Sequence, residues 1–380
     1  MMSPYIIVYI LLLLIAFCSF ITNKDFKYLY YVCFVILTIM LCLRYGQGTD
    51  YFGYQGIYNS APSTLFFSGI YYTDAIHAEV GWKILNHILK ILGIEFKYFV
   101  LVISIFEMLC INHFIKIYCP NKNIALLMIY PTLYLTFCFS ILRQGFVICV
   151  FLGVILDLIL KKKYWAFICL TLLLSTIHSS ALVILLSPFI IKVKIKYLYR
   201  LLFMSMIFGI LCFLGFFDPL LKVLGYIGSA SAYLSSITVN YIALCERVIM
   251  TFLVVYMYLV YTKKEKNKKV ENLLKMYLFG TIIYLFFFWN SLISSRLGYI
   301  FKPLEISLIT IMIARLDKFK SIIILIIFLL STMLTLKNID SYIEQGRYYP
   351  NVKVINYPYI SLFNSEDIYK YRSLEGIIDI

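Results

Sequence analysis

Long, almost uncharged apolar stretches alternate with short polar segments along nearly the whole chain. About 20 consecutive apolar residues are enough for a helix to cross a bilayer. The stretches that meet or approach this length are Tyr5–Thr22, Tyr28–Leu43, Phe96–Tyr118, Ile124–Ser140, Gly145–Leu160, Tyr164–Ile177, Ala181–Ile191, Leu198–Phe217, Ala243–Tyr261, Leu273–Asn290, Leu297–Ala314 and Ser321–Leu336. The pattern therefore predicts an all-α, polytopic membrane protein with about 12 transmembrane helices.

The stretch between Lys163 and Lys192 is interpreted as two short arms that turn near His178-Ser179-Ser180. A single crossing here would put the basic clusters before and after it on opposite sides, although cytoplasmic loops normally collect Lys and Arg. Each arm would measure about 20 Å at 1.5 Å per residue, which is less than the hydrocarbon core of about 30 Å. We therefore expect a re-entrant-like hairpin near His178 whose turn lies in a water-accessible recess.

The distribution of lysine predicts the topology of the remaining chain. With the lysine-rich loops in the cytoplasm, both termini face the periplasmic side of a bacterial inner (cytoplasmic) membrane. We expect one transmembrane domain over residues 1–336, with external loops at 44–95 and 218–241, and a polar periplasmic tail at 337–380. Since the inner loops are short and basic, the protein is expected to work at its outer face.

Composition excludes several classes of function. The formal net charge of +15 comes mostly from short loops, so it indicates topology and contact with anionic lipid headgroups, and we expect no nucleic-acid partner. The 10 cysteines lie within or at the ends of apolar stretches and form no CxxC pair. We interpret them as small buried residues, and expect no metal, disulfide or cofactor.

Four arginines fall at outer ends of apolar stretches, where positive charge is normally depleted: Arg44, Arg143, Arg247 and Arg296. A guanidinium group binds phosphate oxygens through parallel hydrogen bonds. We interpret these arginines as a clamp for an anionic, phosphate-bearing, lipid-linked substrate. Two alternatives stay open: Arg44 reaches lipid headgroups, or Arg143 pairs structurally with Asp50 or Glu79.

Three ionisable groups in the outer segments are candidates for proton transfer. Asp50 lies in a glycine-bounded loop, Glu79 precedes an amphipathic helix predicted from Val80, and His178 lies at the turn of the hairpin. Each also has a plainer interpretation: Asp50 meets Arg44 across the turn, Glu79 caps its helix, and His178 bonds across helices.

Together these segments resemble the EpsG-like branch of the Wzy-type polysaccharide polymerases, over most of the chain. The residues that carry the resemblance are Arg44, Gly48-Thr49-Asp50-Tyr51, Tyr54, Glu79-Val80-Gly81-Trp82, Leu142-Arg143-Gln144-Gly145, His178-Ser179-Ser180-Ala181, Arg296 and Tyr299. The region 218–241 and the tail do not match the pattern.

The resemblance implies a glycosyltransferase that joins oligosaccharide repeat units carried on undecaprenyl pyrophosphate, at the periplasmic face, into O-antigen, capsular or exopolysaccharide. Asp50, Glu79 and His178 would be catalytic, and the arginines with Tyr51 and Tyr299 would bind the pyrophosphate and substrate. The partners would be the lipid-linked oligosaccharide, the bilayer, and a chain-length regulator and flippase. A lipid-linked oligosaccharide flippase or exporter and an O-antigen ligase are alternative functions.

Overall fold

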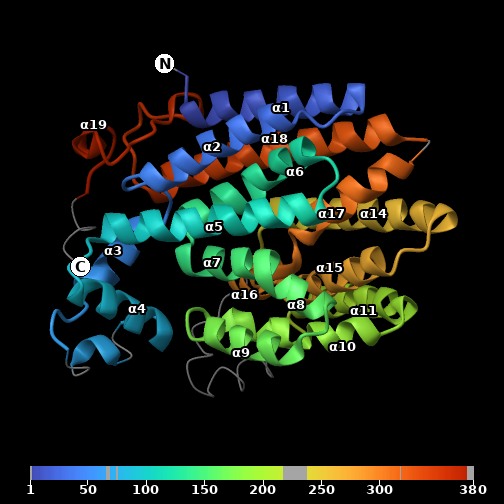
Figure 1. Ribbon diagram of the computed structural model, residues 1–380, viewed down its shortest axis with the longest axis horizontal. Helices are drawn as coiled ribbons and strands as arrows, with labels where there is room; N and C mark the ends of the chain where they lie inside the picture. Colours follow the sequence, from blue (N-terminus) through green and yellow to red (C-terminus); the bar gives the residue numbers. More distant parts are fainter. Residues whose placement is uncertain (1, 66–68, 74–75, 217–237, 317, 375–380) are drawn as a thin grey trace. The chain divides into compact units, whose positions relative to one another are not determined.

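The computed structural model describes residues 2–65, 69–73, 76–216, 238–316 and 318–374. Within these ranges every regular element is a helix, and β-pairing is confined to isolated bridges such as that between Arg44 and Ser361. The predicted all-α fold is therefore confirmed (Figure 1). The chain divides into two compact units, one formed by Met1–Ser179 with Ile324–Ile380 and the other by Ser180–Ile323.

The first unit contains a bundle of apolar helices with smaller helices at one end. Its longer elements are α1 (Pro4–Thr22), α2 (Lys27–Leu43), α5 (Phe96–Tyr118), α6 (Lys122–Ile129) with the π-helix η2 (Tyr130–Ser140), α7 (Leu142–Val150) with the π-helix η3 (Phe151–Ile155) and α8 (Leu156–Leu160), α9 (Tyr164–Ser175), and most of α18 (Lys320–Gln345). Its shorter elements are α3 (Tyr51–Asn59), η1 (Ile70–Tyr72), α4 (Val80–Ile91), η8 (Val354–Asn356), η9 (Ser365–Asp367) and α19 (Ile368–Tyr371).

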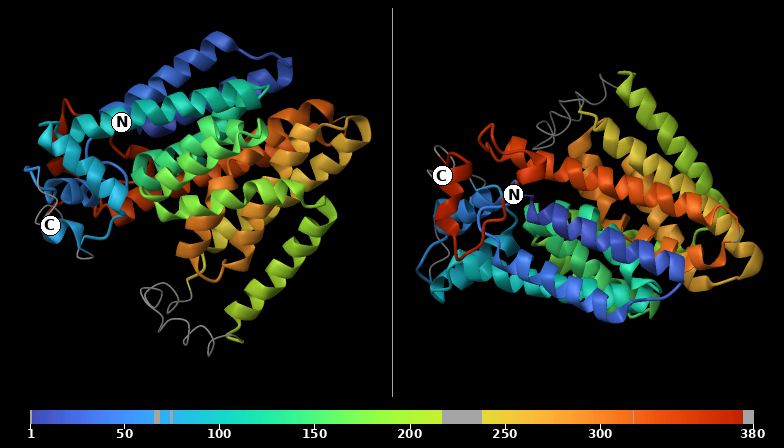
Figure 2. Two further views of the ribbon diagram at one scale, coloured as in Figure 1. Left: turned by 60° about the horizontal axis from the view of Figure 1, so that its bottom comes forward. Right: turned by 90° about the horizontal axis from the view of Figure 1, so that it is seen from above.

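Each long helix buries one stripe and exposes another. Along α1, Tyr5, Tyr9 and Leu12 are buried, whereas Leu14 is exposed. The helix packs on α6, and the Tyr9 hydroxyl lies 2.8 Å from Thr332 Oγ1 of α18, which runs beside it (Figure 2). Exposed apolar side chains of this kind are expected where a helix faces lipid.

One end of the first unit gathers the N-terminus, the loop after α2 and the tail. The Ser3 amide donates to Ile355 O at 2.7 Å, and the Tyr5 hydroxyl donates to Gln47 Oε1 at 2.7 Å. At the other end of α1, Asp25 accepts from Lys122 Nζ at 2.7 Å. The loop after α2 and the Lys122 turn therefore lie at opposite ends of α1, and the side of the membrane that each faces stays a prediction.

The second unit contains η4 (Ser179–Leu186), α10 (Ser187–Lys192), α11 (Ile195–Phe213), α14 (Tyr241–Lys264), α15 (Lys268–Phe286), α16 (Ser291–Gly298), η6 (Tyr299–Phe301), α17 (Leu304–Met312) and η7 (Ile313–Arg315). Here α15 packs against α10, α11, α16 and α17. The apolar stretch predicted at Leu297–Ala314 is bent by 48° between Phe301 and Leu304. Most of the predicted external loop at 218–241 lies outside the described residues.

Seven described helices are long and apolar enough to cross a membrane, or eight if the bent pair is one span. Three predicted spans are shorter apolar helices: Lys27–Leu43, Tyr164–Ser175 and Ser179–Lys192. A multi-pass membrane protein is supported, whereas the count of about 12 spans is not confirmed. The helix breaks at Thr176–His178, where the sequence placed the turn, and the hairpin itself stays a prediction. The last helix continues to Gln345, beyond the predicted end at Leu336.

Candidate functional site

The amphipathic helix predicted from Val80 is present as α4, with its polar face turned inward. Lys83, Asn86 and His87 are buried, whereas Val80 is 61% exposed and Leu92 is 66% exposed. Lys83 Nζ donates to Thr73 O at 2.9 Å, so the buried charge is satisfied inside the loop. The outward apolar face fits a helix that lies in the membrane interface.

The carboxylate of Glu79, just before α4, is held by two other segments of the sequence. Its Oε2 accepts from Arg143 Nη1 in the first turn of α7. Its Oε1 accepts from the Ser179 amide at 3.0 Å and lies 3.3 Å from Ser179 Oγ. The side chain makes no capping hydrogen bond to α4 in the described part of the chain. The structural partner of Arg143 is therefore Glu79, and the capping interpretation of Glu79 is not supported.

Gly81 explains why these segments approach so closely. Its amide donates to Thr176 O at 2.8 Å, and a Cβ at this position would lie 2.1 Å from Thr176 Oγ1. Any larger residue would therefore push the start of α4 away from the turn that carries Ser179.

The charge of Glu79 is stabilised by its neighbours. Burial alone would raise the pKa of Glu79, but the Arg143 guanidinium, the Ser179 amide and His178 together hold the pKa of this carboxyl below its ordinary value. Glu79 is thus an anion at neutral pH, partly exposed, beside a guanidinium and an imidazole. An ionised carboxylate in such a place is able to accept a proton or to orient its cationic neighbours.

Aromatic residues form the floor of this site. The Arg143 guanidinium carbon lies 5.7 Å from the centroid of Tyr54 in α3, and Tyr54 packs edge-on against the buried Trp82. Burial raises the pKa of the Tyr54 hydroxyl, and Asp50 raises it further, against the opposing effect of Arg143. Asp50 is exposed and directly precedes α3, whereas Tyr51 is buried against Phe96. The site therefore draws residues from four of the sequence segments that carried the resemblance.

Arg44 points into the first unit and is 1% exposed. Its guanidinium donates to Ser104 Oγ at 2.9 Å and to Cys138 O at 2.8 Å, and it lies 5.1 Å from the centroid of Phe139. The charge of Glu107, a fully buried residue of α5, is close enough to interact with it.

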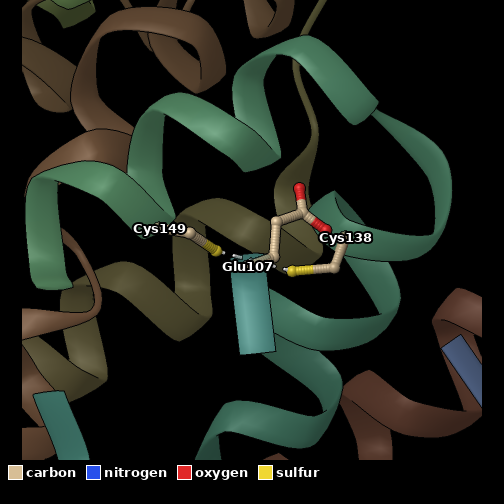
Figure 3. Close-up of side chains that lie close together, drawn as sticks. All are labelled: Glu107, Cys138 and Cys149. Carbon is tan, nitrogen blue, oxygen red and sulfur yellow. Dashed lines mark hydrogen bonds between the residues drawn. The ribbon is translucent and has the colours of Figure 1, made fainter. Parts of the chain in front are cut away.

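Figure 3 shows Glu107 between the thiols of Cys138 and Cys149. Neither Glu107 nor these cysteines entered the predicted site.

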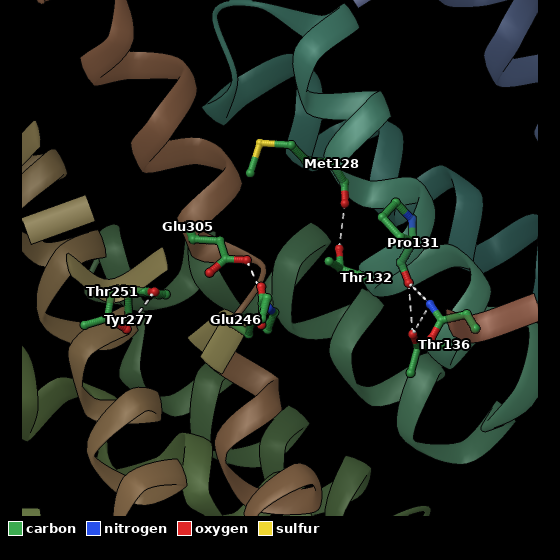
Figure 4. A network of polar contacts seen from close by, with 10 residues as sticks. Met128, Pro131, Thr132, Thr136, Glu246, Thr251, Tyr277 and Glu305 are labelled. Carbon is green, nitrogen blue, oxygen red and sulfur yellow. Dashed lines mark hydrogen bonds and ion pairs between the residues drawn. The ribbon is translucent and has the colours of Figure 1, made fainter. Parts of the chain in front are cut away.

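The second unit has its own buried charges. Lys302, at the bend between η6 and α17, forms an ion pair with Glu246 and lies 3.3 Å from Glu305 Oε1. The Glu246 and Glu305 carboxylates appear in Figure 4. The neighbouring Arg247 guanidinium is 2% exposed and lies 4.9 Å and 5.5 Å from the ring centroids of Tyr284 and Tyr299.

The predicted site residues thus fall into two groups. Asp50, Tyr51, Glu79, Arg143 and His178 belong to the first unit, and so does the buried Arg44. Arg247, Arg296 and Tyr299 belong to the second unit, where Arg296 is partly exposed. The convergence of all four arginines on one substrate stays a prediction.

Sequence reasoning missed Glu107, Ser179, Lys302 and Glu305 as individual candidates. Three of these charges lie inside stretches that were themselves predicted to span the membrane, namely Glu107, Lys302 and Glu305. Ionisable residues in a span are costly and are usually paired or functional, so that rule alone would have identified them. The contact of Ser179 with Glu79 joins residues 100 positions apart and has no local signal.

Comparison with known proteins identifies the class that this arrangement serves. The model of the EpsG family matches residues 27–358. The chain therefore belongs to the EpsG family, a family of Wzy-like polysaccharide polymerases, as its sequence motifs indicated. Neither the curated proteins nor the solved structures contain a match to it.

Proposed function

We propose that this protein joins oligosaccharide repeat units carried on undecaprenyl pyrophosphate, at the periplasmic face of a bacterial inner membrane. The family supports a polysaccharide polymerase role. The observation that carries the finer proposal is the contact of Glu79 with Arg143 and Ser179, at the end of the first unit that also holds the N-terminus and the tail. It combines a proton acceptor with a binder of phosphate oxygens in one partly exposed place.

The proposed reaction is a displacement at the anomeric carbon of the donor. The acceptor hydroxyl oxygen forms the new glycosidic bond, and the bond from the anomeric carbon to undecaprenyl pyrophosphate breaks. The hydroxyl proton passes to Glu79 Oε1 or Oε2, and the electron pair leaves with the pyrophosphate. Arg143 stabilises the negative charge that develops on the leaving group, which is the main electrostatic demand of this step.

The neighbouring residues take supporting roles in this proposal. His178 donates to a phosphate oxygen, since an imidazole near neutral pH is able to hold a proton. Asp50 is exposed at the start of α3 and orients a sugar hydroxyl. Arg44 is buried against Ser104 and Cys138, so we assign it to holding the loop that carries Asp50. Tyr51 is buried against Phe96 and supports the proposed sugar site next to Asp50.

Pyrophosphate binding by Arg247, Arg296 and Tyr299, which belong to the second unit, stays a prediction from the sequence. Further partners are the bilayer, a chain-length regulator and a flippase. The product is an O-antigen, a capsule or an exopolysaccharide.

A deletion strain complemented with variants tests the proposal through the gel pattern of its surface polysaccharide. Loss of a polymerase leaves single-repeat products, whereas loss of a flippase leaves none, and loss of a ligase leaves polymer that is not attached to its final acceptor. Arg143→Lys keeps the charge but lacks the planar fork, so we expect mostly single-repeat products. Arg200→Lys, at an exposed arginine of α11, is the matched control. Normal polymer from both Arg143→Ala and Glu79→Gln at normal expression would refute the assignment.

A further inference from the structure

Three side chains able to bind a metal meet in the core of the first unit. Glu107 comes from α5, Cys138 from the π-helix η2 and Cys149 from α7, and all three are buried (Figure 3). The two sulfur atoms lie 3.7 Å apart, and a carboxylate oxygen lies within 4.8 Å of both. Neither Cys is bonded to another in a disulfide.

Two glycines bring α5 close enough for this cluster to form. A Cβ on Gly145 would lie 2.9 Å from the carbonyl of Phe137 and 3.1 Å from Glu107 Oε1. A Cβ on Gly153 would lie 2.7 Å from the Cα of Cys110. Cys110 follows Glu107 by one helical turn and is close enough to interact electrostatically with Glu107 and Cys138. Cys110 thus lies near this cluster, although outside the group of three donors whose atoms are within 4.8 Å of one another.

The Glu107 carboxylate lacks the partners that a buried anion requires. Neither of its oxygen atoms has a conventional hydrogen-bond partner in the described part of the chain. The thiol of Cys138, a weak donor, is close enough to interact with it. Burial of an unpaired carboxylate is strongly unfavourable. Arg44 supplies one positive charge nearby, but its guanidinium donates to Ser104 and to backbone carbonyls.

We propose that Glu107, Cys138 and Cys149 bind one Zn²⁺ ion, with Cys110 as the fourth donor. Tetrahedral coordination with Zn–S bonds of about 2.3 Å places two thiolate sulfurs about 3.8 Å apart, which is the separation already present between Cys138 and Cys149. A set of thiolates with one carboxylate suits zinc and disfavours magnesium and calcium. Each coordinating thiol releases one proton to solvent as the ion binds.

The ion would join α5 to the helix that carries Arg143. It would thus fix a part of the core without taking part in proton transfer, and it is independent of the proposed reaction. The absence of a CxxC pair from the sequence had predicted no metal site. Cys138 and Cys149 are 11 residues apart, and Glu107 lies on another helix. Only the fold brings these three side chains together.

The zinc content of the full-length protein, purified in detergent without chelators, tests this proposal. Mass spectrometry of the metal should find about one zinc per chain, and Cys138→Ser with Cys149→Ser should lower it about tenfold. The matched controls are Cys33→Ser in α2 and Cys212→Ser in α11, because both thiols are also buried. These controls should keep the ion.

Two further measurements separate loss of the site from loss of the fold. Circular dichroism and gel filtration establish whether the double variant is folded. In the wild-type protein, Co²⁺ exchanged for Zn²⁺ should give a thiolate-to-cobalt charge-transfer band. Wild-type protein without zinc and without that band, or a folded double variant with the wild-type zinc content, would overturn the proposal.

Discussion

Arg372 in the tail donates from Nη1 to the carbonyl oxygen of Gly46 at 3.2 Å. Its guanidinium lies 5.2 Å from the centroid of Phe52 and 5.1 Å from that of Tyr348. A residue beyond the family match, which ends at 358, therefore holds the loop between Arg44 and Asp50. The tail, which the sequence predicted to be polar and periplasmic, packs against the loop and the helix α3 that carry Asp50 and Tyr54.

The first prediction concerns this contact. Arg372→Ala removes a buried hydrogen bond from a charged donor together with its packing, so we expect a loss of about 1–3 kcal/mol in stability and shorter or less abundant polymer. Lys370→Ala removes an exposed partner of Asp367 and should change neither. Thermal melting in detergent and the polysaccharide gel measure the two effects. Equal behaviour of the two variants would contradict the role of Arg372.

The second prediction uses two glutamates in similar local settings. Glu79 and Glu95 each directly precede a helix and have nearly the same backbone angles. Glu95, however, pairs with Lys97 at the surface, where both side chains are exposed. We expect Glu79→Gln to lose at least about 100-fold in polymerisation rate, the usual effect of removing a general base. Glu95→Gln should be close to wild type. A rate assay with purified lipid-linked repeat units makes the comparison. Equal losses of polymerisation rate in Glu79→Gln and Glu95→Gln would show that both substitutions act only through folding.

The third prediction is a shift in pH dependence. The folded-state pKa of Glu79 is lowered, so its contribution to stability is present above its unfolded pKa and is lost as pH falls through the folded value. Arg143→Ala removes the largest opposing influence and leaves burial, which raises the pKa. The loss of stability, and of any residual activity, that accompanies a fall in pH should therefore begin at a higher pH in this variant. Melting temperatures measured across the acidic range provide the test, and an unchanged pH of onset would argue against the pairing.

The fourth prediction concerns the close approach of η2 and α7 at Gly145. Gly145→Ala places a methyl group against the backbone of Phe137, so we expect a loss of about 1–3 kcal/mol from overpacking. Gly53→Ala is the control, because a Cβ there meets nothing within 4 Å. Since Gly53 lies in α3, its replacement should stabilise the helix slightly. Stability equal to wild type for Gly145→Ala would show that the two helices are less closely packed.

The fifth prediction tests the sides of the membrane. In a protein without native cysteines, new cysteines at Asp50 and Tyr359 should react with a membrane-impermeant reagent from outside. Those at Lys162 and Lys266 should react only after the membrane is opened. Labelling of Lys162 and Asp50 from the same side would contradict the orientation of the first unit.

The sequence predicted the long helices well because a helix that crosses a membrane requires a long run of apolar residues. It placed the end of α2 at Leu43, the whole of α5 and the start of α4, as the structure has them. It missed α3, whose short sequence contains two glycines and polar residues. This helix depends on its tyrosines packing against Trp82, Phe96 and Phe99, which lie far along the chain.

The sequence named Glu79 and Arg143 but not Ser179, and it did not predict the contacts among them. Glu79 was named as one possible partner of Arg143, and the structure selects it from the two alternatives. The separation of 64 residues between them carries no periodicity that would reveal the pair. The inward turn of Arg44 was equally hidden, because its partners include backbone carbonyls, which any sequence supplies.

The break at Thr176–His178 has a mechanical consequence. Ser179, whose amide holds Glu79, is the last residue of the first unit, and Ser180 is the first residue of the second. The hydrogen bond from the Ser179 amide therefore anchors the chain to the Glu79 carboxylate at the last residue before the second unit begins.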